Sequence, residues 1–182
     1  MLTFRIPLAA VVLAMTVLGQ EQGDKAAPLE QFKKQVDAFL KVRKMVTDQL
    51  PKLKPTPSAE ELATRKTQLA ASLAKARAGA AQGDIFIPEV ATEFRRLGQI
   101  AMDGKNGTRV HKSLARSEPV KGTVHVNDLY PEKVPLQSMP PTLLMALPKL
   151  PMELEYRLVG RTLVLRDTEA NLIVDFLPEA IP

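Results

Sequence analysis

The amino-acid sequence predicts an α+β fold with helices in the N-terminal part and a small antiparallel sheet at the end. Between residues 28 and 118, apolar residues recur at steps of three and four, the period of a helix with one buried face. From residue 153 to 182 they alternate with polar residues, as in half-buried strands. Residues 119–152 are rich in proline, which interrupts regular elements. We therefore expect a bundle of three amphipathic helices, a proline-rich crossing, and a β-meander that packs on the helices.

The first nineteen residues have the parts of a cleavable signal peptide. Arg5 supplies a positive charge, residues 6–18 are almost wholly apolar, and Gly19 is a small residue suited to a peptidase. The apolar run is shorter than the roughly twenty residues of a membrane span and contains Pro7. We expect cleavage after Gly19, no retained membrane span, and a mature chain that begins with a polar lead at residues 20–27 in the periplasm or outside the cell.

Three amphipathic helices are predicted to follow this lead. The first ends near residue 50, before a connector that contains three prolines. The second begins at Ser58, which forms a capping box with Glu61, and it closes at Gly83. The third begins at Pro88, a residue that suits the first turn of a helix. Their predicted buried stripes are Leu29, Phe32, Val36, Phe39, Leu40, Val46 and Leu50; Leu62, Leu69, Leu73, Ala76 and Ala80; and Val90, Phe94, Leu97 and Ile100.

Shorter elements are predicted in the middle of the chain. Val110 and Leu114 suggest a short fourth helix over residues 108–116, and the alternation over residues 120–126 predicts one strand. Six prolines then leave room only for a turn or two of helix over residues 142–147. We expect this segment to be extended or to wrap another part of the molecule.

The last thirty residues predict three strands joined by turns at residues 160–161 and 167–171. Asp175 stands among apolar residues of the third strand. We predict that its carboxylate pairs with Arg157 or Arg166 across the sheet, a structural role.

Composition excludes several classes of site. The chain contains no cysteine, so disulfides, thiolate zinc sites and a lipid anchor on cysteine are excluded. The net charge is +5, with sixteen Lys or Arg against nine Asp or Glu in residues 28–112, and seven against nine in residues 113–182. This basic front half is compatible with attraction to an anionic surface or with an ordinary solvated helical face. Aromatic residues make up 4% of the chain and do not interleave with basic ones, so we predict no sequence-specific nucleic-acid binding.

The C-terminal residues carry a resemblance to known proteins. Residues 150–160 (LPMELEYRLVG), followed by residues 163–167 and 172–175, resemble uncharacterised exported bacterial proteins. The same order of elements is more distantly similar to the small C-terminal module of periplasmic proteins linked to nickel and cobalt homeostasis. Residues 82–86, 88–90 and 93–97 also resemble the first group and extend that resemblance over the mature chain. It implies export but no activity, and no ligand residues of the metal-linked family match.

Candidate chemistry is sparse. Ser72 and Lys75 fit the Ser-x-x-Lys pattern of penicillin-binding enzymes, but the other two elements of those enzymes are missing. One interpretation of His111, His125 and Asp128 is a labile metal site. The other is that they are ordinary surface residues. The carboxylates available for acid–base chemistry or for simple surface charge are Glu153, Glu155, Asp167 and Glu169. Residues 104–108 have the composition of a phosphate loop without its spacing and contain a glycosylation sequon at Asn106.

These patterns assign no catalytic residue, cofactor or metal ligand. We predict a non-enzymatic exported protein of the bacterial cell envelope that binds another protein or an anionic envelope surface through its basic helical face and its proline-rich segment. The alternatives are a periplasmic accessory protein of metal homeostasis and, third, an exported serine hydrolase that uses Ser72 and Lys75.

Overall fold

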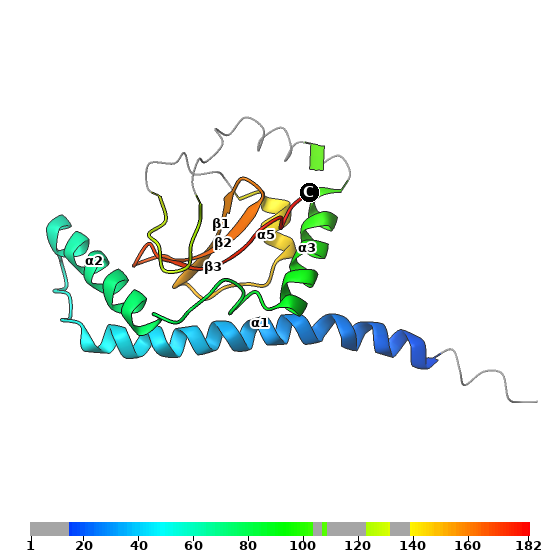
Figure 1. Cartoon of the computed structure of the whole chain (residues 1–182), viewed down its shortest axis with the longest axis horizontal. Helices are drawn as coiled ribbons and strands as arrows, with labels where there is room; N and C mark the ends of the chain where they lie inside the picture. Colours follow the sequence, from blue (N-terminus) through cyan, green and yellow to red (C-terminus); the bar gives the residue numbers. More distant parts are fainter. Residues whose placement is uncertain (1–14, 104–106, 109–122, 132–138) are drawn as a thin grey trace, which may run out of the picture.

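The computed structural model describes residues 15–103, 107–108, 123–131 and 139–182, with side chains from residue 26 onward. Its helices are α1 (Met15–Gln49), α2 (Ala59–Ala76), α3 (Pro88–Met102) and α5 (Pro141–Ala146). Its strands are β1 (Leu154–Val159), β2 (Thr162–Asp167) and β3 (Ile173–Leu177), which form one antiparallel sheet in the order β1-β2-β3. The predicted α+β fold is confirmed (Figure 1).

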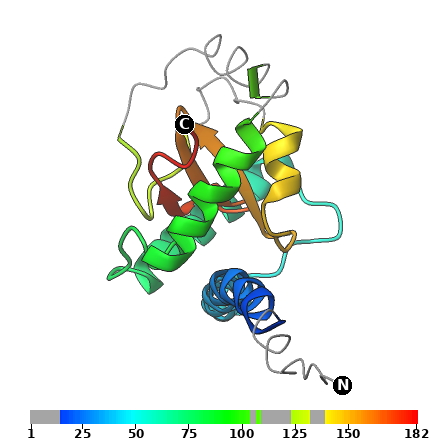
Figure 2. The ribbon, with the colours of Figure 1, turned by 90° about the vertical axis from the view of Figure 1, so that its right-hand side faces the viewer.

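Helix α1 is the long helix against which α2, α3 and the sheet pack. It includes residues 20–27, and α2 and α3 stand at separate positions along it, with the sheet between them (Figure 1). Viewed nearly along α1, the sheet, α3 and α5 all lie on one side of this helix (Figure 2). Its predicted stripe is buried as expected at Phe32, Val36, Phe39 and Val46, and Arg43 is buried in the same stripe.

The stripe of α2 differs from the prediction at both ends. Leu69, Ala70 and Leu73 are buried, whereas Leu62 and Ala76 are exposed. The helix has the predicted capping box at Ser58 but ends at residue 76 rather than at Gly83. The backbone oxygen of Arg77 accepts a hydrogen bond from the Asn127 amide side chain at 2.8 Å, and this contact replaces the continuation of the helix.

The stripe of α3 also needs one correction. Val90 and Phe94 are buried as predicted, but Ile100 is 54% exposed, and the buried positions further along are Gly98, Ala101 and Met102. The contact between α3 and the C-terminal segment is therefore made at a small residue, Gly98, and not at Ile100. A search for large apolar residues overlooks such a contact.

Gly98 permits the close approach of α3 to the end of the chain, and we predict that Gly98→Ala destabilises the protein. A Cβ atom at this position would lie 2.2 Å from the backbone oxygen of Ala180, which cannot move without displacing the C-terminal segment. Alanine favours a helix by about 1 kcal/mol over glycine, but overpacking of this kind costs roughly 1–3 kcal/mol or more. Urea unfolding should report a net loss for Gly98→Ala and no loss for Gly79→Ala, because an added Cβ at Gly79 meets no atom of the described structure within 4 Å. A gain for Gly98→Ala would contradict the packing described here.

The C-terminal sheet follows the predicted meander. β1 pairs with β2 from Leu154↔Asp167 to Val159↔Thr162, and β3 completes the sheet with an irregularity at residues 165/166 of β2. Gly160 has a φ of 60°, the positive value that the first position of a two-residue type II′ hairpin turn requires. One face of the sheet packs on α1, α3 and α5 through Leu154, Tyr156, Leu158, Leu163, Leu165 and Val174.

The proline-rich crossing agrees with the prediction only in part. α5 confirms the short helix predicted over residues 142–147. Residues 123–126, the described part of the strand predicted at 120–126, are not a strand: they run into a turn at Asn127, whose φ is 69°. Backbone pairing with the sheet begins at Asn127, whose amide donates to the Ile173 oxygen at 2.9 Å, and includes an isolated bridge between Leu129 and Leu172. Residues 120–122 and nearly all of the predicted helix at 108–116 lie outside the described residues.

Candidate binding groove

An apolar hollow lies between α5, the following extended segment and β1. Its volume is about 760 Å³. Leu144 and Met145 of α5 are 51% and 87% exposed and form part of its wall. The lining residues are Met139, Leu144, Met145, Leu147, Pro148, Lys149, Leu150, Leu154, Glu155, Tyr156 and Arg157. We call this hollow the α5–β1 groove.

The extended segment 148–151 forms one end of the groove. It also borders a smaller hollow of about 360 Å³ against α1, so it lies between two cavities. The Tyr156 hydroxyl donates to the Pro148 backbone oxygen at 3.1 Å, and the Leu154 amide donates to the Pro151 backbone oxygen at 3.1 Å. Burial raises the pKa of the Tyr156 hydroxyl above its ordinary value, so this group stays protonated and can hold the segment in place.

Cations outnumber anions at the polar margin of the groove. Arg157 and Arg166 both donate to the carboxylate of Glu155, Arg157 from Nη2 at 2.6 Å, and exposed Lys149 adds a third positive charge. The Arg157 Nε atom is buried and has no hydrogen-bond partner among the described residues. The groove thus combines apolar walls with a cationic margin, which suits an apolar ligand that also carries an acceptor or a negative charge.

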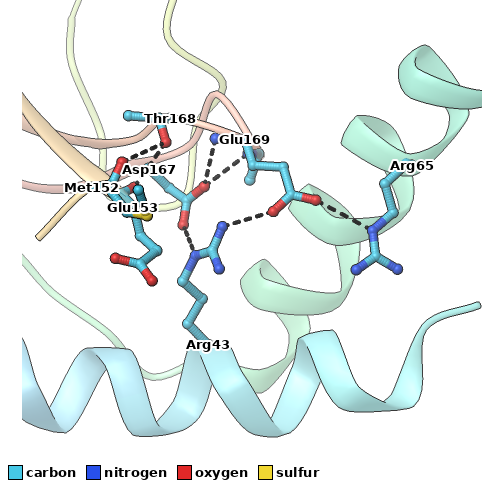
Figure 3. A network of polar contacts seen from close by, with 8 residues as sticks. Arg43, Arg65, Met152, Glu153, Asp167, Thr168 and Glu169 are labelled. Carbon is cyan, nitrogen blue, oxygen red and sulfur yellow. Dashed lines mark hydrogen bonds and ion pairs between the residues drawn. The ribbon is translucent and has the colours of Figure 1, made fainter. Parts of the chain in front are cut away.

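Two of the predicted acid–base carboxylates, Asp167 and Glu169, are bound by arginines outside the groove. Asp167 is fully buried and accepts from Arg43 Nε at 2.6 Å, while Glu169 accepts from Arg43 Nη2 at 2.8 Å and from Arg65 Nε at 3.3 Å (Figure 3). The other Asp167 oxygen accepts the amides of Glu169 and Ala170 at 3.1 and 2.8 Å. This cluster, here the Arg43 network, joins α1 and α2 to the turn between β2 and β3. Its carboxylates are paired with cations, so its evident role is structural.

Burial and pairing act in opposite directions on Arg43. Burial lowers the pKa of its guanidinium, but the hydrogen bonds and charges of Asp167 and Glu169 outweigh burial and raise that pKa above its ordinary value. Arg43 therefore remains charged wherever the protein is folded.

The predicted pairing of Asp175 with Arg157 or Arg166 is wrong. Both arginines bind Glu155, and the Asp175 carboxylate instead accepts backbone N–H groups from the loop after α2. The distances are 3.0 Å to the Gly83 nitrogen, 2.8 Å to the Ile85 nitrogen and 2.9 Å to the Phe86 nitrogen. One side chain thus accepts hydrogen bonds from the backbone amides of a loop almost a hundred residues away in the sequence. Sequence spacing does not reveal such a contact.

The remaining candidate residues form no assembled site in the described part of the chain. Ser72 is half-buried, Lys75 is exposed, and the structure gives no hydrogen bond between these two described residues. His125 and Asp128 do come together, with Nδ1 and Oδ2 3.0 Å apart at the surface. His111 and residues 104–106 lie outside the described residues. Among the residues described, no group of three or more His, Asp or Glu side chains is placed to hold a metal ion.

Sequence reasoning pointed to the right segment for the groove but missed its residues. Around Met139, Leu144 and Met145 the sequence predicts a short helix over residues 142–147 in a segment that is otherwise extended or wraps another part of the molecule, and it singles out none of these side chains. Its signal was the combination of repeated prolines with apolar residues that no strand or long helix would absorb. The opposite wall, β1, was predicted, but not its position at the edge of the sheet.

Comparison with known proteins leaves the groove as the main guide to function. No family model, curated protein or solved structure matches the chain. Within the described residues, no helix combines the length and apolar character that crossing a membrane requires.

Proposed function

We propose that this chain is an exported, non-enzymatic binding protein of the bacterial cell envelope, and that it binds another protein in the α5–β1 groove. The exposure of Leu144 and Met145 over a hollow of about 760 Å³ carries the proposal. Contiguous apolar surface of this kind is costly in water and is typical of binding sites. Methionines such as Met139 and Met145 adapt their shape readily to a partner. Export itself rests on the N-terminal signal pattern and on the resemblance to exported proteins.

The charge distribution favours a protein partner over an anionic polymer. The exposed lysines of α1 at positions 33, 34, 41 and 44 alternate with Glu30, Asp37 and Asp48, and Lys44 pairs with Asp48 at 2.7 Å. Many arginines of the basic front half are already engaged in hydrogen bonds within the molecule: Arg43, Arg65, Arg77 and Arg96. A polyanion would meet a mixed surface rather than a continuous positive stripe.

The groove can be tested with two methionine variants. Met145→Glu places a charge in the groove wall, whereas Met152→Glu changes an equally exposed methionine, 88% against 87%, that does not line the groove. We expect a partner captured from envelope extract and then purified to bind the wild type and Met152→Glu alike. Met145→Glu should weaken binding at least about tenfold, equivalent to about 1.4 kcal/mol. Titration calorimetry measures this difference, and equal binding by all three proteins would refute the groove as the site.

The metal-homeostasis alternative depends on His125 and Asp128, which lie within hydrogen-bond distance at the surface. It predicts that Ni²⁺, Co²⁺, Cu²⁺ or Zn²⁺ raises the Tm of the wild type, because a ligand bound to the native state stabilises it. The rise should disappear in the His111→Ala, His125→Ala double variant. An unchanged Tm in all four metals would remove this alternative.

A further inference from the structure

We propose that the partner places an amphipathic helix in the α5–β1 groove, with its apolar face toward α5 and an acidic side chain beside Lys149. This inference rests on the proposed function and specifies the chemistry of the partner. A hydrophobic groove that receives the apolar face of a helix is a general mode of peptide recognition. Three features of the groove support a helix: its apolar walls, the hydrogen bonds already made by its backbone, and the charge at its margin.

The accessible part of the groove wall is apolar. Leu144 and Met145 of α5 are 51% and 87% exposed. The other apolar side chains that line the hollow are partly or fully buried: Met139, Leu147, Leu150, Leu154 and Tyr156. A ligand in this hollow removes Leu144 and Met145 from water and meets further apolar side chains beneath them. Apolar groups on the ligand are therefore the ones that this surface binds most favourably.

Backbone groups beside the groove are already used by the protein. The Pro148 oxygen accepts a hydrogen bond from the Tyr156 hydroxyl, and the Pro151 oxygen accepts one from the Leu154 amide, each at 3.1 Å. On β1, Tyr156 and Leu158 are only 5% and 1% exposed, so their backbone is not accessible to an added strand. The groove thus binds the side chains of a ligand rather than its backbone.

This condition favours a helix over an extended peptide. An extended peptide in an apolar groove would bury N–H and C=O groups without partners, and each such group is costly. A helix pairs these groups internally and presents only side chains. Apolar residues at positions i, i+3, i+4 and i+7 form one face of it. Such a face matches both the apolar walls of the groove and the engaged backbone beside it.

The charge at the margin favours an acidic flank on the bound helix. Three charged residues line the groove, and two of them pair with each other: Arg157 Nη2 lies 2.6 Å from a Glu155 oxygen. The third, Lys149, is exposed and forms no ion pair within the described residues. An Asp or Glu beside the apolar face of the helix complements this ammonium group. Exposed ion pairs add little affinity but select partners by charge.

Two displayed libraries of peptides of about sixteen residues, long enough to form a helix, test this inference. Both have the same composition and are selected on the purified protein. In the first library the apolar residues recur at positions i, i+3, i+4 and i+7, and in the second they alternate with polar residues. We expect binders from the first library alone, with Asp or Glu enriched beside the apolar face.

The tightest peptide, made synthetically, is then changed at a residue opposite its apolar face. Proline at this position should lower the affinity roughly a hundredfold, because proline strongly disfavours a helix interior, and alanine should change it less than about threefold. In the protein, Lys149→Glu should weaken an acidic peptide about threefold to tenfold and its uncharged analogue less than about twofold. Titration calorimetry measures each affinity. Equal responses to proline and alanine would overturn the helix, and equal weakening of both peptides by Lys149→Glu would overturn the acidic flank.

The methionine variants distinguish failure of the helix from failure of the groove. Binders from the alternating library that Met145→Glu releases would overturn the helix and leave the groove as the site. The same conclusion follows if neither library yields a binder while a folded partner binds in a manner sensitive to Met145→Glu. A helical peptide that binds Met145→Glu as well as the wild type would contradict both proposals. Release by Met145→Glu but not by Met152→Glu, together with sensitivity to proline, supports both.

Dodecanoate, an amphiphile without a peptide backbone, tests the remaining class of occupant. Its single apolar chain and carboxylate also complement apolar walls beside a lysine. Saturable binding of dodecanoate that Met145→Glu abolishes, with no binding of any peptide or protein, would overturn both proposals in favour of a small amphiphile. We expect dodecanoate to bind at least about a hundredfold more weakly than the helical peptide, because it covers less of the groove.

Discussion

Asp175→Ala is expected to lower the free energy of unfolding by roughly 3–5 kcal/mol, because it removes the acceptor of several buried amides at once. The carboxylate is fully buried and holds the N–H groups of Gly83, Ile85 and Phe86. Each buried donor left without a partner costs about 1–3 kcal/mol. Against a total stability of roughly 5–15 kcal/mol, this is a large fraction.

The same substitution also affects the neighbouring Arg77. Burial lowers the pKa of the Arg77 guanidinium, and the charges of Asp175 and Asp84 act in the opposite direction. Arg77 donates to the Val174 oxygen at 2.8 Å and would remain a half-buried cation with less compensating charge after Asp175 is removed. The loss of Asp175 therefore removes the hydrogen bonds that hold the loop after α2 and also part of the negative charge that compensates Arg77.

Urea unfolding monitored by circular dichroism measures this effect, and Asp84→Ala is the matched control. Asp84 lies in the same loop and carries the same charge, but it is exposed, and among the described residues it accepts one hydrogen bond, from the Ala81 amide at 3.0 Å. We expect a loss of less than about 1 kcal/mol for the control. Equal losses for the two variants would show that charge, rather than the buried hydrogen bonds of Asp175, determines the effect.

Local periodicity predicted most of the architecture. The stripe of α1, the capping box of α2 and the alternation of the three strands all depend on residues within a few positions of one another. Contacts between distant segments were inaccessible to that reasoning. Gly98 is needed because the backbone of Ala180 lies close to it, and the Gly83 amide donates a hydrogen bond to Asp175. Neither contact produces a pattern in the sequence.

The candidate site was less predictable than the fold for the same reason. The groove arises where α5 lies beside an edge strand, and strand order at the edge is a property of the assembled sheet. The charged candidate residues differ from their appearance in the sequence for another reason. Glu155, Asp167 and Glu169 looked available for chemistry in the sequence, but arginines from β1, β2, α1 and α2 bind them in the structure. A carboxylate's availability depends on its neighbours in space, which its neighbours in sequence do not specify.

Arg43→Met is expected to destabilise the protein by about 3–5 kcal/mol, the second large effect. Methionine keeps much of the buried volume of the side chain but leaves Asp167, which is 0% exposed, without its cation. Breaking a buried pair by removing one partner is costly because an uncompensated buried charge remains. Arg65→Met is the control, because Arg65 bonds the partly exposed Glu169 at the longer distance of 3.3 Å. Its loss should stay near 1 kcal/mol or below.

A double-mutant cycle between Arg43 and Asp167 determines whether this loss comes from the pair. Asp167→Asn keeps an oxygen for the amides of Glu169 and Ala170 and removes the charge. If pairing dominates, the double variant Arg43→Met, Asp167→Asn should be less destabilised than the sum of the two single variants by about 1–3 kcal/mol, since neither charge is then left alone. Additive losses would indicate instead that Arg43 acts through its packing between α1 and the turn after β2. The Arg43 network would then stabilise the fold by the shape of its side chains and not by their charges.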